Sequence, residues 1–315
     1  MHIHVLGYYP EGESILIVLY DDSTQLPLKS ILVDSYEVNN HNKIEMVLKR
    51  YDLQNRKLDY VIWTHPDRDH SIGFSNIVAN YSSNNTLYLL PDGLSVWGVI
   101  NDWEKFKSWA AITRSKIARK FNVERVNTSN RRTFPIHYGT VYYDGIYDVN
   151  FSIEILTPFA GQVFRHLEYN KTHKGNHMSI SFTIRFGNLG FYFGGDTENM
   201  TIEEIDSSRL EDLYFVKIPH HGSDSSDLLP SKLNNQQNEK GPLIVSVTTG
   251  YHKGSSDLPL TSVLDLYKSK SSLILRTDND NHQNSYGIWS CEFNRDSCKP
   301  WSCHCVGDSS IYYQI

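Results

Sequence analysis

A cluster of potential metal ligands that directly follows a strand-like run constrains this chain more than any other feature of its sequence. Residues 58–63 read LDYVIW, an apolar run typical of a buried strand, and residues 64–73 continue as THPDRDHSIG. Four side chains that can bind metal fall within six positions: His65, Asp67, Asp69 and His70. Residues 65 and 67 can face one ion, whereas residues 69 and 70, at a turn into a helix, can face a second ion nearby. The segment therefore predicts a metal centre at the end of a strand.

The ligand types narrow the choice of metal. Imidazole and carboxylate groups together favour zinc, manganese or iron over calcium, whose sites are built from oxygen ligands. A polar loop in which Asp69 caps a helix is the alternative, but a cap needs only one Asp or Ser. We therefore expect two divalent ions, zinc or manganese, at this segment.

Three later segments carry side chains that can reach the same centre. Asp196 follows two glycines after an apolar run, and these small neighbours allow the close approach that a bridging carboxylate needs. Residues 218–223, IPHHGS, end another strand-like run with His220, His221 and Ser223. Residues 175–179, GNHMS, place Asn176 and His177 just before a strand. A single histidine at a strand end is as easily a surface residue, so His177 alone stays open.

The distribution of strand-like and helix-like segments from end to end predicts a mixed α/β fold. No repeat is visible, and the polar stretch at residues 231–241 is typical of an exposed loop rather than a boundary, so we expect a single domain over residues 1–315. The four cysteines all lie in a C-terminal tail, residues 291–315, which favours free thiols and a cytoplasmic location, with a zinc site as the alternative. No apolar run is long enough to predict a membrane span.

The charge distribution leaves room for one basic region. A net charge of -6 excludes a protein that is basic over its whole surface. We expect a helical insertion at residues 92–137, in which only Glu124 opposes seven basic side chains between residues 113 and 132: Arg114, Lys116, Arg119, Lys120, Arg125, Arg131 and Arg132. This region is either a solvated helix face or a basic wall that aligns phosphates beside the metals.

Taken in order, these motifs resemble the metallo-β-lactamase superfamily. They comprise His-x-Asp-x-Asp-His from residue 65, Asn-x-x-Ser from residue 176, Gly-Asp at 195–196 and Pro-His-His-Gly-Ser from residue 219. More narrowly, they are similar to the metallo-hydrolase domain of ComEC-type DNA-uptake competence proteins, over about residues 58–278. The resemblance implies a four-layer αββα sandwich with the ligands on loops along one edge of two sheets.

The resemblance also implies a ligand set. His65, Asp67 and Asp196 would hold the first ion, and Asp69, His70, Asp196 and one histidine of the 220/221 pair would hold the second. We prefer His220, because it comes first off the strand, with His221 behind it or as a proton donor. Asn176 falls where the competence proteins have an Asn, and His177 falls near where other branches supply a histidine, so both stay open.

Two departures from the competence proteins are visible. Residues 250–259 read GYHKGSSDLP and lack their Gly-His-Pro, so the part of His252 in substrate contact is open. The membrane portion of those proteins is absent, which predicts a free-standing hydrolase.

These features predict a dinuclear metal-dependent hydrolase, a phosphodiesterase or nuclease acting on nucleic acid or a nucleotide. Asp67, Asp196 and His221 are the expected catalytic residues. Substrate contacts are expected from Asn176, Ser223, His252, Arg114, Arg119 and Lys120. The alternatives are a hydrolase of a small ester, amide or choline-phosphate-type substrate, and a non-enzymatic, metal-stabilised module that works with a partner protein.

Overall fold

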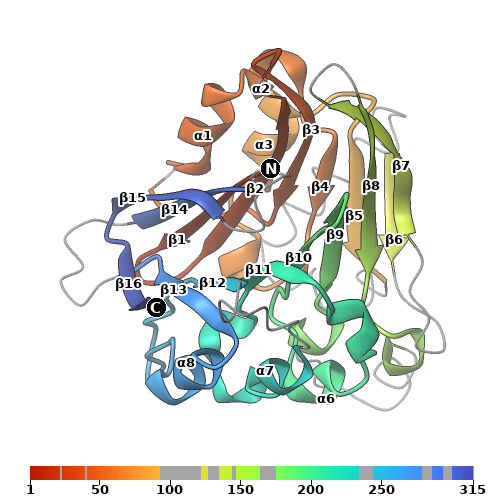
Figure 1. Cartoon of the computed structure of the whole chain (residues 1–315). Helices are drawn as coiled ribbons and strands as arrows, with labels where there is room; N and C mark the ends of the chain where they lie inside the picture. The colour runs from red at the N-terminus through yellow and green to blue at the C-terminus, as the bar shows by residue number, and fades with distance from the viewer. Residues whose placement is uncertain are drawn as a thin grey trace.

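The computed structural model describes residues 1–21, 23–39, 41–92, 122–126, 135–143, 147–163, 175–233, 244–278, 286–293 and 300–314. The helices of these residues are α1 (Ile44–Arg50), α2 (Leu53–Arg56), α3 (Phe74–Tyr81), α6 (Asn199–Ile202), α7 (Leu229–Lys232) and α8 (Thr261–Tyr267). None of them is long and apolar enough to cross a membrane. The strands of the described residues form two eight-stranded sheets (Figure 1).

The first sheet has the strand order β15-β14-β1-β2-β3-β4-β5-β6. Its strands are β1 (His2–Tyr8), β2 (Glu13–Asp21), β3 (Leu26–Val33), β4 (Tyr60–Ile62), β5 (Leu87–Pro91), β6 (Asn122–Val126), β14 (Tyr286–Phe293) and β15 (Pro300–Gly307). The half from β15 to β3 is antiparallel and the half from β3 to β6 is parallel.

The second sheet has the order β16-β13-β12-β11-β10-β9-β8-β7. Its strands are β7 (Pro135–Tyr143), β8 (Tyr147–Ile155), β9 (Phe182–Phe186), β10 (Leu189–Phe193), β11 (Leu213–Lys217), β12 (Ile244–Thr248), β13 (Ser271–Arg276) and β16 (Ser310–Gln314). Strands β10 to β13 are parallel, so their carboxyl ends meet at one edge of the sheet.

Both faces of each sheet are buried, as strand β2 illustrates. Ile15 and Ile17 pack in an apolar cluster that joins residues of both sheets, whereas Leu16 packs on the opposite face with residues of α1 and α3. A third cluster joins the outer face of the second sheet to α8 and to the region of α6 and α7 (Figure 1). The predicted mixed α/β fold is thus confirmed.

The observed structure differs from the sequence-based prediction in two segments, the predicted insertion and the predicted C-terminal tail. The described end of the predicted insertion is strand: β6 pairs with β5, and β7 pairs with β8. Residues 122–126 and 135–137 are therefore strand rather than helix, and residues 93–121 and 127–134 of the predicted insertion at 92–137 lie outside the described residues. The helical pattern at residues 102–121, with Arg114, Arg119 and Lys120, lies outside the described residues.

The C-terminal segment belongs to the sheets. Strands β15 and β16 occupy the end of the first and second sheet, respectively. Cys291 and Cys303 face each other across β14 and β15, with their Sγ atoms 3.0 Å apart. No group of potential metal ligands in the described part of the chain includes a cysteine.

A buried histidine in β1 should make stability depend on pH. His4 is 1% exposed, and its ring lies between Ser290 Oγ, 2.7 Å from Nδ1, and Tyr51 Oη, 2.8 Å from Nε2. Burial, with smaller contributions from His2 and Arg50, lowers the pKa of His4 from 6.5 to about 3. The folded state therefore binds this proton more weakly than the unfolded state does.

This histidine is expected to contribute a loss of stability as pH falls from 6.5 toward 3. The loss is about 1.4 kcal/mol per pH unit, because one proton is taken up on unfolding. His4→Gln should remove that part of the slope, measured by urea unfolding at pH 7, 6 and 5. Equal slopes in the wild type and the variant would show that folding does not lower the pKa of His4.

Candidate metal centre

The candidate ligands lie on loops that leave the carboxyl ends of strands in both sheets. Residues 65–70 follow β4 of the first sheet, Asp196 follows β10, and His221 follows β11 of the second sheet. The loop after β12 approaches the same place, because Thr249 contacts the ring of His221. Parallel strands in each sheet thus bring segments distant in sequence to one edge.

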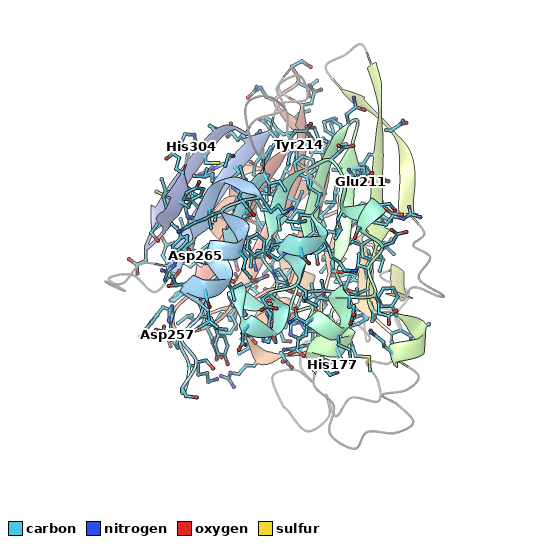
Figure 2. All side chains as sticks on the ribbon, turned by 60° about the horizontal axis from the view of Figure 1, so that its bottom comes forward. His177, Glu211, Tyr214, Asp257, Asp265 and His304 are labelled. Atoms are coloured by element: carbon cyan, nitrogen blue, oxygen red, sulfur yellow. The ribbon has the colours of Figure 1, made fainter. Side chains whose placement is uncertain are left out.

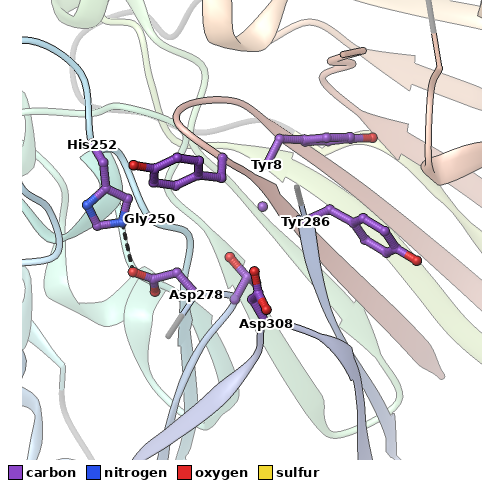
Figure 3. Close-up of a pocket in the computed structure, with 9 residues that line it drawn as sticks. Tyr8, Gly250, His252, Asp278, Tyr286 and Asp308 are labelled. Carbon is purple, nitrogen blue, oxygen red and sulfur yellow. Dashed lines mark hydrogen bonds and ion pairs between the residues drawn. The ribbon is translucent and has the colours of Figure 1, made fainter. Parts of the chain in front are cut away.

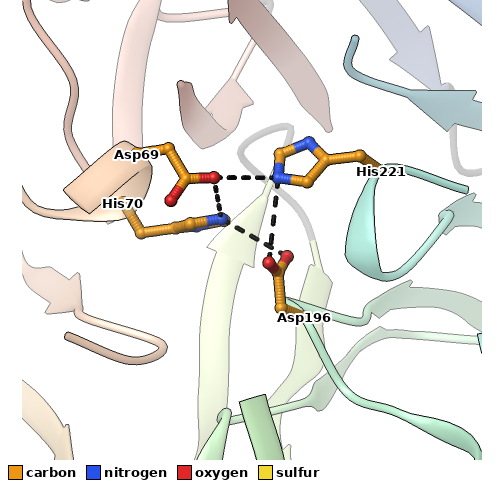
Figure 4. A group of neighbouring side chains, drawn as sticks. All are labelled: Asp69, His70, Asp196 and His221. Carbon is orange, nitrogen blue, oxygen red and sulfur yellow. Dashed lines mark hydrogen bonds and ion pairs between the residues drawn. The ribbon is translucent and has the colours of Figure 1, made fainter. Parts of the chain in front are cut away.

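Four buried side chains meet at this edge, and Figure 4 shows them pointing toward one another: Asp69, His70, Asp196 and His221. His70 Nε2 lies 3.4 Å from Asp69 Oδ2 and 3.3 Å from Asp196 Oδ1. His221 Nε2 lies 3.1 Å from Asp69 Oδ2 and 3.7 Å from Asp196 Oδ2. Ligands of one tetrahedral zinc ion, bonded at about 2.0–2.2 Å, lie about 3.4 Å from each other. The spacing of the four side chains therefore fits a single transition-metal ion.

His65 and Asp67 extend this cluster on one side. His65 Nε2 lies 3.6 Å from Asp196 Oδ2 and 3.7 Å from Asp67 Oδ2. His65 is fully buried, whereas the side chain of Asp67 is 38% exposed. The carboxylate of Asp196 thus lies near all three rings, with Oδ1 closest to His70 and Oδ2 close to both His65 and His221.

Several atoms of the cluster lack a hydrogen-bond partner among the described residues: His65 Nε2, His70 Nε2 and Asp196 Oδ1. Buried polar atoms nearly always have a partner, because an unpaired group costs free energy without solvation. These three atoms converge on one place and come from residues that bind transition metals. The donor set and its unpaired atoms therefore fit a divalent metal ion.

Hydrogen bonds on the far side of each ring fix its orientation. His70 Nδ1 lies 2.7 Å from Asp34 Oδ2, and Asp34 also accepts hydrogen bonds from the amide and hydroxyl of Thr64. The Thr64 hydroxyl in turn lies 3.1 Å from His65 Nδ1. Asp34 ends the strand-like run of β3, and our sequence analysis did not include it. With Nδ1 engaged in this way, each ring presents Nε2 to the centre.

The electrostatics of the cluster favour a cation. Burial raises the pKa of Asp196, but His70 and His221 outweigh it and hold this pKa well below its usual value. Burial alone would lower the pKa of His70, yet Asp196, Asp69 and Asp34 raise it well above its usual value. Three carboxylates around one imidazole concentrate negative charge in a buried place, which attracts positive charge.

The structure brings His221 into the cluster in place of the preferred His220. His220 Nδ1 lies 2.7 Å from Ser225 Oγ, and its Nε2 lies 3.1 Å from Asn176 Nδ2. Both histidines have left-handed backbone angles, with φ 46 and 51, respectively. This tight turn directs the second ring inward, so the order in which the residues leave the strand does not predict which ring joins the cluster.

Asn176 and His177 lie beside the cluster but not in it. His177 Nε2 lies 3.0 Å from Glu198 Oε2, and Asn176 donates to the other oxygen of Glu198 over 3.2 Å. Figure 2 shows His177 at the end of the molecule that carries these loops, away from His304 of β15. Burial raises the pKa of Glu198, but hydrogen bonds from His177 and Asn176, together with the charge of His220, lower it overall. Sequence reasoning missed Glu198, because a single acidic residue after Gly-Asp gives no signal.

The described substrate-contact candidates lie outside the cluster. Ser223 caps the next turn, where its Oγ accepts from the amide of Ser225. His252 lines a separate pocket with Tyr8, Gly250, Asp278, Tyr286 and Asp308 (Figure 3). Its Nε2 lies 2.9 Å from Asp278 and its Nδ1 2.6 Å from Asp257, and these hydrogen bonds raise the pKa of His252 against the effect of burial.

Comparisons with known proteins leave the function to be inferred from the chain itself. No protein-family description matches the sequence, and no curated protein is similar to it. The fold is similar to the solved structure of a protein from Parabacteroides distasonis that is provisionally named a metal-dependent hydrolase. The two chains are 15% identical, with a TM-score of 0.40, and the similarity covers 83% of this chain and 92% of the other.

Proposed function

We propose that the chain is a metal-dependent hydrolase of the metallo-β-lactamase type that cleaves phosphodiester bonds in nucleic acid or a nucleotide. One observation carries this proposal: buried ring nitrogens and carboxylate oxygens from both sheets converge, and three of these atoms lack a hydrogen-bond partner among the described residues. The apolar clusters support the four-layer αββα arrangement as well, since helices are packed on the outer face of each sheet.

Two sets of residues would hold two divalent ions, zinc or manganese. His65, Asp67 and Asp196 form the first set, and Asp69, His70, Asp196 and His221 form the second, with Asp196 shared between them. When bound, such ions lower the pKa of a water molecule and neutralise charge on phosphoryl oxygens. In this chemistry water is the nucleophile, so the proposed site does not need a nucleophilic side chain.

The remaining site residues are assigned to proton transfer and to substrate contact. Asp67 is the ligand candidate most open to solvent, so it is the proposed acceptor for the proton released from water. Asn176, Ser223 and His252 are the proposed substrate contacts.

The phosphodiester preference rests on the motifs shared with competence-type hydrolases and on the basic residues between positions 113 and 132. We propose nucleic acid as the partner of that region, with Arg114, Arg119 and Lys120 contacting phosphates. A partner protein that delivers the substrate is a further proposal, with the polar residues 231–241 as its contact.

Turnover assays with separate substrate classes test this function. We expect the zinc- or manganese-loaded chain to hydrolyse bis-p-nitrophenyl phosphate and single-stranded DNA or RNA. Chelation should abolish this turnover and added metal should restore it, because the ions neutralise the charge that develops on phosphate. Rapid hydrolysis of a carboxyl ester or thioester, with no cleavage of any phosphodiester, would overturn the proposed substrate class.

A further inference from the structure

A line of buried polar groups leads away from the far side of the His221 ring. His221 Nδ1 lies 2.8 Å from Thr249 Oγ1, and Thr249 Oγ1 donates to Glu13 Oε2 over 2.7 Å. The same oxygen of Glu13 pairs with Lys217 Nζ at 2.8 Å. Glu13, Thr249 and Lys217 are each 0% exposed. They come from β2, the end of β12 and β11, so the line joins both sheets beneath the metal centre.

Glu13 and Lys217 occupy positions where the strand pattern calls for apolar residues. Glu13 lies on the same face of β2 as Ile15, and Lys217 lies on the same face of β11 as Phe215. Ile15 and Phe215 both pack in the apolar cluster between the sheets. A buried ion pair adds little stability over apolar side chains of similar size, because both charges lose their hydration. Packing alone therefore does not account for this pair.

The chemistry of the groups fixes the direction of the hydrogen bonds. An ionised carboxylate only accepts, so the Thr249 hydroxyl donates its proton to Glu13. The Thr249 oxygen then accepts from Nδ1–H of His221. With Nδ1 protonated, Nε2, which lies 3.1 Å from Asp69 Oδ2, is the nitrogen that is free to give up its proton and bind a metal ion. Without an acceptor at Glu13, the hydroxyl is free to donate to Nδ1 instead. Nε2 would then carry the proton and could not bind a metal ion.

We propose that Glu13 is a positioning residue that acts through Thr249 to hold His221 in its metal-binding tautomer. Lys217 keeps the Glu13 carboxylate charged and in place, and it also donates to the carbonyl of Ile218 over 3.0 Å. His70 is oriented by direct contact with Asp34, whereas His221 depends on this longer relay. The inference rests on the metal-binding part of the proposed function and is tested without any substrate.

Two double variants separate positioning from packing. Glu13→Met with Lys217→Met removes both charges and the acceptor, whereas Glu13→Gln with Lys217→Met removes both charges but keeps a carbonyl acceptor. Both should fold, because no uncompensated charge stays buried. We expect the first to bind Zn²⁺ about 10- to 100-fold more weakly than the wild type, as when a partner behind a metal ligand is lost. The second should stay within about threefold of the wild type, because its acceptor remains.

A single hydroxyl provides an independent pair of variants with little risk to folding. Thr249→Val should weaken Zn²⁺ binding to the same extent as the Met variant, and Thr249→Ser should preserve it. Thr183→Val is the matched control, since Thr183 is also fully buried and its Oγ1 has no hydrogen-bond partner among the described residues. Affinity is measured by competition with a chromophoric chelator, and folding by circular dichroism and urea unfolding.

The outcomes distinguish this inference from the proposed function. Wild-type Zn²⁺ affinity in folded Thr249→Val and in the Met double variant would overturn the positioning role and leave the ion pair purely structural. Failure of the wild type to take up zinc would overturn the metal-dependent function itself. Weak binding in both Gln and Met double variants would show that the charge of Glu13, rather than its acceptor, matters, and would overturn the tautomer relay.

Discussion

Asp196→Asn is expected to lower metal-dependent turnover by about 10³-fold or more while the chain keeps its fold. Its two carboxylate oxygens face His70 on one side and His65 and His221 on the other, so one substitution weakens both proposed metal sites. Charge stabilisation by bound metal is worth several kcal/mol, and each 1.36 kcal/mol is a factor of ten in rate. The amide keeps the shape of the carboxyl group, so packing is little changed.

The measurement is the rate on bis-p-nitrophenyl phosphate at saturating zinc or manganese, with circular dichroism of the same samples. Asp21→Asn is the matched control: Asp21 is 3% exposed and lies at the opposite end of β2 from Glu13, where it accepts from Ser23 and Thr24. The control should retain wild-type turnover. A folded Asp196→Asn protein with wild-type rates would contradict the shared-ligand role of Asp196.

His221→Ala is expected to reduce zinc affinity by more than about 100-fold, whereas His220→Ala should cost less than about tenfold. The first substitution removes a ring nitrogen that lies 3.1 Å from Asp69 Oδ2, inside the cluster. The second removes a ring that contacts Asn176 and Ser225 beside it. Loss of a ligand exceeds the about 10- to 100-fold effect of losing a group that only supports one.

These neighbouring histidines serve as controls for each other, because they have the same side chain, adjacent positions and similar φ angles. Zinc titration against a competing chelator provides the comparison. The reverse order of affinities would place His220 at the metal and would support the preference based on sequence alone.

The residues at the centre of the candidate site could be predicted from the sequence, because they occur in local motifs. The His65 to His70 segment packs four candidate ligands into six positions, and Asp196 and the histidine pair each follow a recognisable strand. The α/β character was also accessible, since strand and helix periods differ. Local spacing, however, does not determine which of two adjacent rings turns inward when both residues adopt positive φ.

The residues that hydrogen-bond the candidate ligands or their partners could not be predicted from the sequence. Asp34 and Glu13 contact the ligands or their partners across large separations in the chain, 36 residues for His70 and 236 for Thr249. Such contacts exist only after the two sheets have formed. The sequence does not indicate that Lys217 is buried either, because a lysine at a strand end is ordinarily solvated. Only the packing of β11 shows its burial.

The number of metal ions held by each chain tests the central claim most directly. The wild type, purified without chelator, equilibrated with Zn²⁺ and freed of excess metal, should retain about two ions per chain by elemental analysis, as expected of a two-metal hydrolase. Asp196→Asn should retain fewer than one under the same treatment, because its lost carboxylate serves both sites. A folded wild-type chain that retains no zinc and takes up no manganese would contradict the account.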